Sequence, residues 1–267
     1  MDVVDLSPLA SITFIGGSLT VSDCPMLTSL AGLSGVTEIQ DDLFIGHNNL
    51  VLNNLGLPNL ETIGSALNLT DNAALTGMTG LDKLTTVKDF WFFGNPELLN
   101  FDDLPMLSTI QNSIEISGND KLEDFTGLEA VTTLGGDVNI VNNLLLTSLQ
   151  GLENITSFSG GINVFNNPGL TTCAITSICT HLSNGGTISV GGNSGAGGCD
   201  SQTEVQNICS PCPTLACNDG LTFNLDASCV YELTDSDLID QVCAQETYTI
   251  TITNQNGGVT SGISHLA

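Results

Sequence analysis

The residues that could carry catalysis are few in this chain and lie far apart in its sequence. It has no arginine, and its histidines and lysines are His47, His181, His265, Lys83, Lys88 and Lys121. Nucleophilic catalysis needs a serine or cysteine beside a histidine that a carboxylate orients, and no such set can be assembled from residues this scattered. We therefore predict that the chain is not an enzyme.

Adjacent acidic residues are the second group with possible chemistry, because a hard cation such as Ca²⁺ binds several converging oxygens. Two pairs occur at 41–42 and 102–103, and Asp235, Asp237 and Asp240 form a looser group near the C-terminus. None of these groups has the spacing of a known calcium loop. We favour solvated surface charge, with calcium binding as the alternative, and predict no metal site and no cofactor.

The charge balance excludes several kinds of partner. The chain carries 29 acidic residues and three basic ones, which gives a net charge of -26 at pH 7. Such a surface repels phosphate backbones and anionic lipid head groups, so we expect neither nucleic acid binding nor membrane insertion. No apolar run reaches the length of a membrane span, and no signal peptide is visible after Met1.

Cysteine usage points to an oxidising compartment. Eight of the nine cysteines fall in the last third of the chain: Cys173, Cys179, Cys199, Cys209, Cys212, Cys217, Cys229 and Cys243. Cys209 and Cys212 have the spacing of a redox or metal pair, but so many neighbouring cysteines favour structural disulfides. We expect a secreted or cell-surface protein, and the spacing leaves the pairing of these cysteines open.

The elements that would position any functional residue come from an internal repeat. Equivalent apolar positions follow one another in steps of 24, 24, 24, 23, 24 and 24 residues, at Ile15, Ile39, Ile63, Val87, Ile110, Leu134 and Phe158. Each repeat contains an alternating L-x-I segment, such as Leu43-x-Ile45, which is typical of a strand. Strands one repeat apart must stack in parallel, so the period predicts an all-β solenoid of about 24 residues per turn.

One polar residue recurs inside this apolar pattern. An asparagine follows the strand in seven of eight turns, at Asn48, Asn72, Asn95, Asn119, Asn143, Asn167 and Asn193, and Cys24 takes its place in the first turn. An inward amide at a bend can bond the backbone of its own turn and of the neighbouring turn. We therefore predict a buried asparagine ladder along the solenoid.

One repeat is a residue shorter than the others. The single 23-residue step runs from Val87 to Ile110, and we place the missing residue in the loop between Phe93 and Leu98, after the strand. This alignment puts Trp91 and Phe93 inside and leaves Phe90 and Phe92 outside. The large inward rings would then compensate for altered packing.

The repeat resembles that of the receptor L-domain family. The phrases LTSLAGLSGVTEI, LTGMTGLDKLTTV and LTSLQGLENITSF are most similar to the forms found in large bacterial surface proteins, and the resemblance covers residues 3 to 209. It implies a right-handed parallel β-helix, similar to leucine-rich repeats, in a secreted or cell-surface multidomain protein. It carries no catalytic residues to this chain.

The sequence divides into three parts. Residues 1–172 are solenoid repeats that begin within a repeat, which suggests a piece of a longer secreted chain with neighbouring domains. Residues 173–212 form a disulfide-tied cap with the last strand, a helix from Ile175 and a capping box at Ser201-x-x-Glu204. Residues 213–267 are the incomplete start of a second β-domain, with a strand at 247–253 and a turn at Asn256-Gly257.

The outward strand positions are the candidate binding surface. Solvated strands rarely need large rings, and this alignment places Phe44, Phe90, Phe92, Asn68, Glu115, Asn139 and Asn163 outward. A neighbouring loop or domain that covers the rings is the alternative. We predict a non-catalytic adhesion or recognition module that binds a protein or a glycan on a cell surface or matrix. The second hypothesis is a polysaccharide-binding accessory region of a secreted enzyme whose catalytic domain lies elsewhere.

Overall fold

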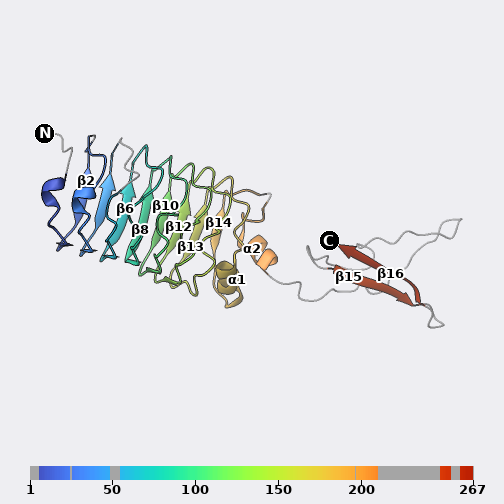
Figure 1. The fold of residues 1–267 in the computed structure, drawn as a ribbon. Coiled ribbons are helices and arrows are strands. Elements are labelled where there is room, and N and C mark those ends of the chain that lie inside the picture. Colours follow the sequence, from blue (N-terminus) through green and yellow to red (C-terminus); the bar gives the residue numbers. More distant parts are fainter. Residues whose placement is uncertain are drawn as a thin grey trace. The chain divides into compact units, whose positions relative to one another are not determined.

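The computed structural model describes residues 6–24, 26–48, 55–195 and 197–209, and the backbone of 247–253 and 259–266. The chain separates into two compact units, Met1–Cys209 and Ser210–Ala267. The first unit is a stack of coils, as Figure 1 shows from its blue to its orange end. No helix in the described ranges is long and apolar enough to cross a membrane.

The main sheet contains one strand from each coil. Its eight parallel strands are β2 (Leu19–Ser22), β4 (Leu43–Gly46), β6 (Ala66–Thr70), β8 (Asp89–Phe93), β10 (Ile114–Ser117), β12 (Val138–Val141), β13 (Ile162–Phe165) and β14 (Ser189–Gly191). Along most strands buried side chains alternate with partly exposed ones, because successive residues point to opposite faces. The prediction of an all-β parallel solenoid with about 24 residues per turn is confirmed.

A second sheet, which the repeat pattern did not predict, precedes the main one in the first six coils. It consists of six two-residue parallel strands: β1 (Phe14–Ile15), β3 (Glu38–Ile39), β5 (Thr62–Ile63), β7 (Thr86–Val87), β9 (Thr109–Ile110) and β11 (Thr133–Leu134). In most of these strands the second residue is a buried aliphatic side chain and the first is partly or fully exposed. The remaining side of the described coils is made mainly of turns. Two short 3₁₀ helices occur near the N-terminal end, η1 (Ser7–Leu9) and η2 (Ala31–Leu33).

Glycine is required where the coils come closest together. Gly127 has a φ of +101°, and a Cβ at this position would lie 2.1 Å from the carbonyl carbon of Phe101 in the preceding coil. Gly151 has a φ of +103° and would place its Cβ 2.0 Å from the carbonyl oxygen of Phe125. Both glycines precede a buried leucine, so the G-L pair of the repeat marks close stacking between coils.

The strand β8 corrects the predicted alignment of the short repeat. Phe90 and Phe92 are both 0% exposed, whereas Trp91 and Phe93 are half-buried on the outer face. The missing residue lies before the strand, because only Lys88 separates β7 from β8 where two residues separate β5 from β6. The predictions that Phe90 and Phe92 are exposed binding residues, and that Trp91 and Phe93 are inward, are therefore wrong.

Aromatic packing explains which rings of β8 turn inward. The Phe92 ring centroid lies 4.5 Å from that of Phe90 and 5.2 Å from that of Phe101. Phe101 in turn stacks on Phe125 of the next coil, with centroids 5.9 Å apart. These four rings fill the interior of two neighbouring coils, and this buried contact stabilises the observed register.

The C-terminal end of the solenoid is a helical cap tied by two disulfides. Its helices are α1 (Thr176–Ser183) and α2 (Gln202–Cys209), and its disulfides are Cys173–Cys199 and Cys179–Cys209. The predicted capping box is confirmed, since Glu204 N–H donates to Ser201 Oγ and Glu204 Oε2 accepts from the Ser201 N–H. Because Cys209 is bonded to Cys179, it is not paired with Cys212 here. Cys212, Cys217, Cys229 and Cys243 lie outside the described residues.

In the second unit the structure describes one antiparallel pair. Strand β15 (Thr247–Thr253) pairs with β16 (Val259–Leu266), and the register shifts between Ile252 and Thr253. The strand predicted at 247–253 is confirmed. The predicted turn at Asn256-Gly257 and the acidic group at 235–240 lie outside the described residues.

Candidate functional site

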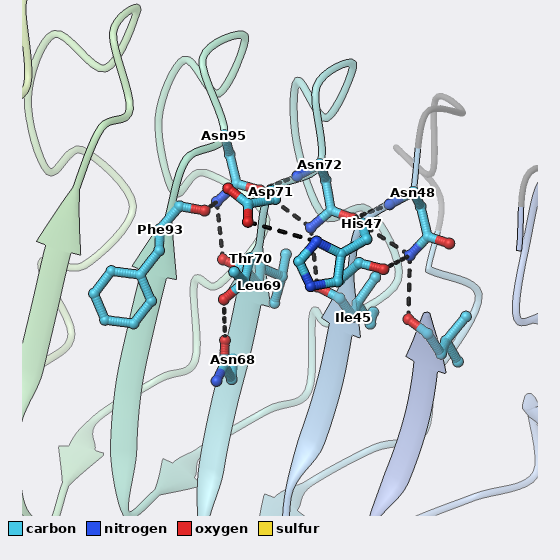
Figure 2. A network of polar contacts seen from close by, with 12 residues as sticks. Ile45, His47, Asn48, Asn68, Leu69, Thr70, Asp71, Asn72, Phe93 and Asn95 are labelled. Atoms are coloured by element: carbon cyan, nitrogen blue, oxygen red, sulfur yellow. Dashed lines mark hydrogen bonds and ion pairs between the residues drawn. The ribbon is translucent and has the colours of Figure 1, made fainter. Parts of the chain in front are cut away.

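A continuous ladder of asparagines holds the ends of the main strands in register. Asn72 is typical: its N–H and its Nδ2 both donate to Oδ1 of Asn95, at 3.2 and 3.1 Å, and its Nδ2 also donates to the Ile45 carbonyl at 2.9 Å. Figure 2 shows this pattern repeating from Asn48 to Asn95. The same contacts continue through Asn119, Asn143 and Asn167 to Asn193. The buried amides therefore satisfy backbone groups that the bend leaves unpaired.

The residue before each ladder position is left-handed, a feature that the repeat pattern did not reveal. These residues, with φ between +51° and +70°, are Asp23, His47, Asp71, Gly94, Gly118, Asn142, Asn166 and Gly192. Left-handed backbone is tolerated mainly by glycine, asparagine, aspartate and histidine. In the sequence, the position before each ladder residue holds only these four residue types, and that restriction could have predicted the left-handed backbone. Two of the side chains, His47 and Asp71, form an exposed pair with Nδ1 3.5 Å from Oδ2 (Figure 2).

The outer face of the main sheet brings one outward residue from each strand into line. We call this line the central column; strand register defines it as Thr20, Phe44, Asn68, Trp91, Glu115, Asn139, Asn163 and Ser189. Five residues predicted for binding lie in it, from Phe44 to Asn163. Trp91 occupies the position that the shifted alignment had assigned to Phe92.

Trp91 is held in place by a chain of hydrogen bonds beneath its ring. Its Nε1–H donates to Ser113 Oγ at 3.0 Å, and the Ser113 hydroxyl donates to Asp89 Oδ1 at 2.8 Å. Asp89 is 5% exposed, and its Oδ1 also accepts from Asn112 Nδ2 at 2.7 Å. The indole orientation is therefore fixed before any partner arrives, and its only hydrogen-bond donor is already used.

The strands after β8, namely β10, β12 and β13, carry a polar ladder on the outer face. Asn139 Nδ2 donates to Glu115 Oε1 at 2.8 Å, and Asn163 Nδ2 donates to Asn139 Oδ1 at 2.8 Å. All three side chains are half-buried. They are spaced by one strand each and fixed by one another, so they present hydrogen-bonding groups in a set geometry.

The two strands before β8 combine an aromatic ring, Phe44 of β4, with an amide, Asn68 of β6. The Phe44 ring lies over Gly46 of its own strand, where an added Cβ would be 2.4 Å from the ring, so glycine allows the ring to lie against the sheet. Asn68, in the next strand, accepts a hydrogen bond on Oδ1 from the Thr70 hydroxyl at 2.6 Å (Figure 2). Its amide nitrogen is left pointing along the outer face as a donor.

The paired acids of the solenoid join neighbouring coils. Asp42 Oδ1 accepts from the Ala66 N–H at 2.9 Å, and Asp103 Oδ2 accepts from the Met78 N–H at 2.6 Å. Among the described residues no group of three or more histidine, cysteine, aspartate or glutamate side chains could hold a metal ion. These carboxylates thus have a structural use that needs no cation.

A comparison of the chain with protein family models, curated proteins and solved structures finds no match in any of the three. Its function is therefore inferred from the central column and from the chemistry of the residues in it.

Proposed function

We propose that this chain is a non-catalytic extracellular recognition module that binds its partner along the central column. The observation that carries the proposal is Trp91, a large ring at an outward position of β8. Its Nε1–H is hydrogen-bonded to buried Ser113, which is in turn hydrogen-bonded to buried Asp89. A strand position that only faces solvent does not need an indole with a fixed orientation. A binding site gains from one, because a rigid aromatic residue adds contact area at low entropic cost.

Two further observations support an extracellular role. The two disulfides of the cap are typical of proteins that fold in an oxidising compartment. The repeat phrases resemble those of receptor L-domains in large bacterial surface proteins, a resemblance that carries no catalytic residues to this chain. The net charge of -26 is compatible with a secreted protein surrounded by salt, where screening removes much of the self-repulsion.

An array that carries both glycans and extracellular proteins tests this function. The parent chain should bind some array members, and the double variant Phe44→Ala with Trp91→Ala should lose them while its melting temperature falls only slightly. Phe14→Ala is the matched control, because Phe14 is a 51% exposed ring on the other sheet. If the double variant binds as the parent does, the central column is not the recognition face.

A further inference from the structure

Resting on the proposed function, we propose that the central column binds a neutral, linear polysaccharide that runs across the strands, along the axis of the solenoid. Trp91 is its stacking platform, and the polar ladder from Glu115 to Asn163 binds its hydroxyl groups.

The strand register sets the direction of the ligand. Column residues in neighbouring strands lie about 4.8 Å apart, so the five steps from Phe44 to Asn163 span about 24 Å. The strand spacing is close to the length of one hexose unit in an extended chain. A sugar chain parallel to the axis therefore meets a new side chain at nearly every unit, whereas a ligand along one strand would meet only three outward residues.

The chemistry of the column matches the two kinds of surface on a sugar. The N–H of Trp91 is used by Ser113, so the indole offers its apolar face, which packs against the C–H side of a pyranose ring. In the next strand Glu115 accepts from Asn139 on Oε1, and among the described residues its Oε2 accepts no hydrogen bond. That oxygen and the spare amide protons of Asn139 and Asn163 can bind hydroxyls at both edges of the ring.

Charge excludes an acidic glycan. The column contains one charged residue, Glu115, and no lysine, and the whole chain has a net charge of -26. A uronate or a sulfated sugar would need basic partners that this face does not provide. A neutral chain gives up no ionic interactions with solvent when it binds here.

The shape of the site favours a sugar chain over a folded protein. A stable protein interface buries about 800 Å² on each partner. Its centre is rich in aromatic residues, which are exposed in the unbound protein. Here the half-buried rings of Phe44 and Trp91 share the central column with asparagine, glutamate and threonine, and half-buried Phe93 lies in the neighbouring column beside Thr70 and Ser117. The polar groups of the central column are already hydrogen-bonded to one another, which lowers the entropic cost of binding a flexible chain.

Trp91 is the only tryptophan in the chain, so its fluorescence reports on this site alone. The full chain is titrated with gluco-, manno-, xylo- and chito-oligosaccharides of increasing length, and with oligogalacturonate as the anionic comparison. At least one neutral series should shift the emission of Trp91, with an affinity that rises with length until the ligand spans the column. Added salt should leave this affinity unchanged, and oligogalacturonate should cause no shift.

Calorimetry with the best oligosaccharide then compares variants. Trp91→Ala should weaken binding about tenfold or more, and Phe14→Ala should leave it unchanged. Trp91→Phe keeps a ring, so it distinguishes lost stacking from lost folding if Trp91→Ala has a much lower melting temperature. Glu115→Gln should reduce the affinity only modestly, because a neutral hydroxyl can still bond the amide oxygen.

Other results would overturn the proposal in distinguishable ways. A Trp91 signal with no neutral series, or with oligogalacturonate alone, excludes a neutral glycan. A strong loss in Glu115→Gln, together with weaker binding at high salt, would identify a cationic ligand. Array binding that depends on Trp91 but survives periodate oxidation of the target would identify a protein partner. That result would support the recognition function and contradict the glycan ligand. Array binding that does not depend on Trp91 would contradict both proposals.

Discussion

The asparagine ladder yields the sharpest prediction about stability, for the variant Asn119→Ala. Asn119 is 0% exposed; its Oδ1 accepts from the Asn95 N–H at 3.2 Å, and its Nδ2 donates to the Phe92 carbonyl at 2.9 Å. Truncation leaves these two buried backbone groups without the amide. Each unsatisfied group costs about 1–3 kcal/mol, so we expect a loss of about 2–6 kcal/mol in the free energy of unfolding.

Chemical denaturation of the disulfide-intact chain measures this loss, with Asn154→Ala as the matched control. Asn154 is exposed and donates from Nδ2 to the Glu129 carbonyl at 2.8 Å, so its truncation should cost less than about 1 kcal/mol. Hydrogen exchange should also become faster at the Asn95 N–H. Equal losses in Asn119→Ala and Asn154→Ala would refute the view that the ladder stabilises the stack.

Three further predictions concern the coils and the cap. Phe92→Ala should cost about 3–5 kcal/mol because it empties the aromatic core, whereas Trp91→Ala on the outer face should cost only about 1–2 kcal/mol; similar losses in thermal melts would contradict the observed register. Ser177→Ala should raise stability by about 1 kcal/mol, since that hydroxyl is buried with no partner in the described structure; a lower melting temperature would refute this. Gly127→Ala should cost about 3–5 kcal/mol from backbone strain and a clash, while Gly185→Ala, equally left-handed but with nothing within 4 Å, should cost about 1–2 kcal/mol; equal values in denaturant titrations would show that coil contact is irrelevant.

The period of the repeat was sufficient to predict the solenoid, the strands of the main sheet and the placing of the ladder asparagines, but not the second sheet. Regular spacing determines these features, because each coil must bury the same face against its neighbour. The cap was also predictable, since Ser201 and Glu204 form a local motif whose geometry depends on four consecutive residues. The pairing of the cysteines could not be predicted, because it depends on how helices α1 and α2 pack against each other.

The inside and outside of β8 could not be read from alternation, because four aromatic residues follow one another there. Either alternate pair could face the core, and a shift of one residue exchanges the two faces. Counting backwards from Asn95 gives the answer: in the other coils the inward residues lie three and five positions before the asparagine, which selects Phe92 and Phe90. The missing residue is absorbed at the corner between β7 and β8, where Lys88, the one residue left, is exposed.

The two ends of the asparagine ladder differ, and this gives the rod a mechanical polarity. At the C-terminal end two disulfides cross-link the cap, one of them from Cys173, directly after the last repeat, to Cys199. At the first coil Cys24 donates its N–H to Asn48, but its thiol bonds only the Ser22 carbonyl of its own strand. Within the described coils, tension should therefore separate those near Cys24 before those near the cap, because no covalent cross-link holds the former. If the chain acts as the recognition module proposed above, the part of the central column nearest the cap would stay folded longest under load.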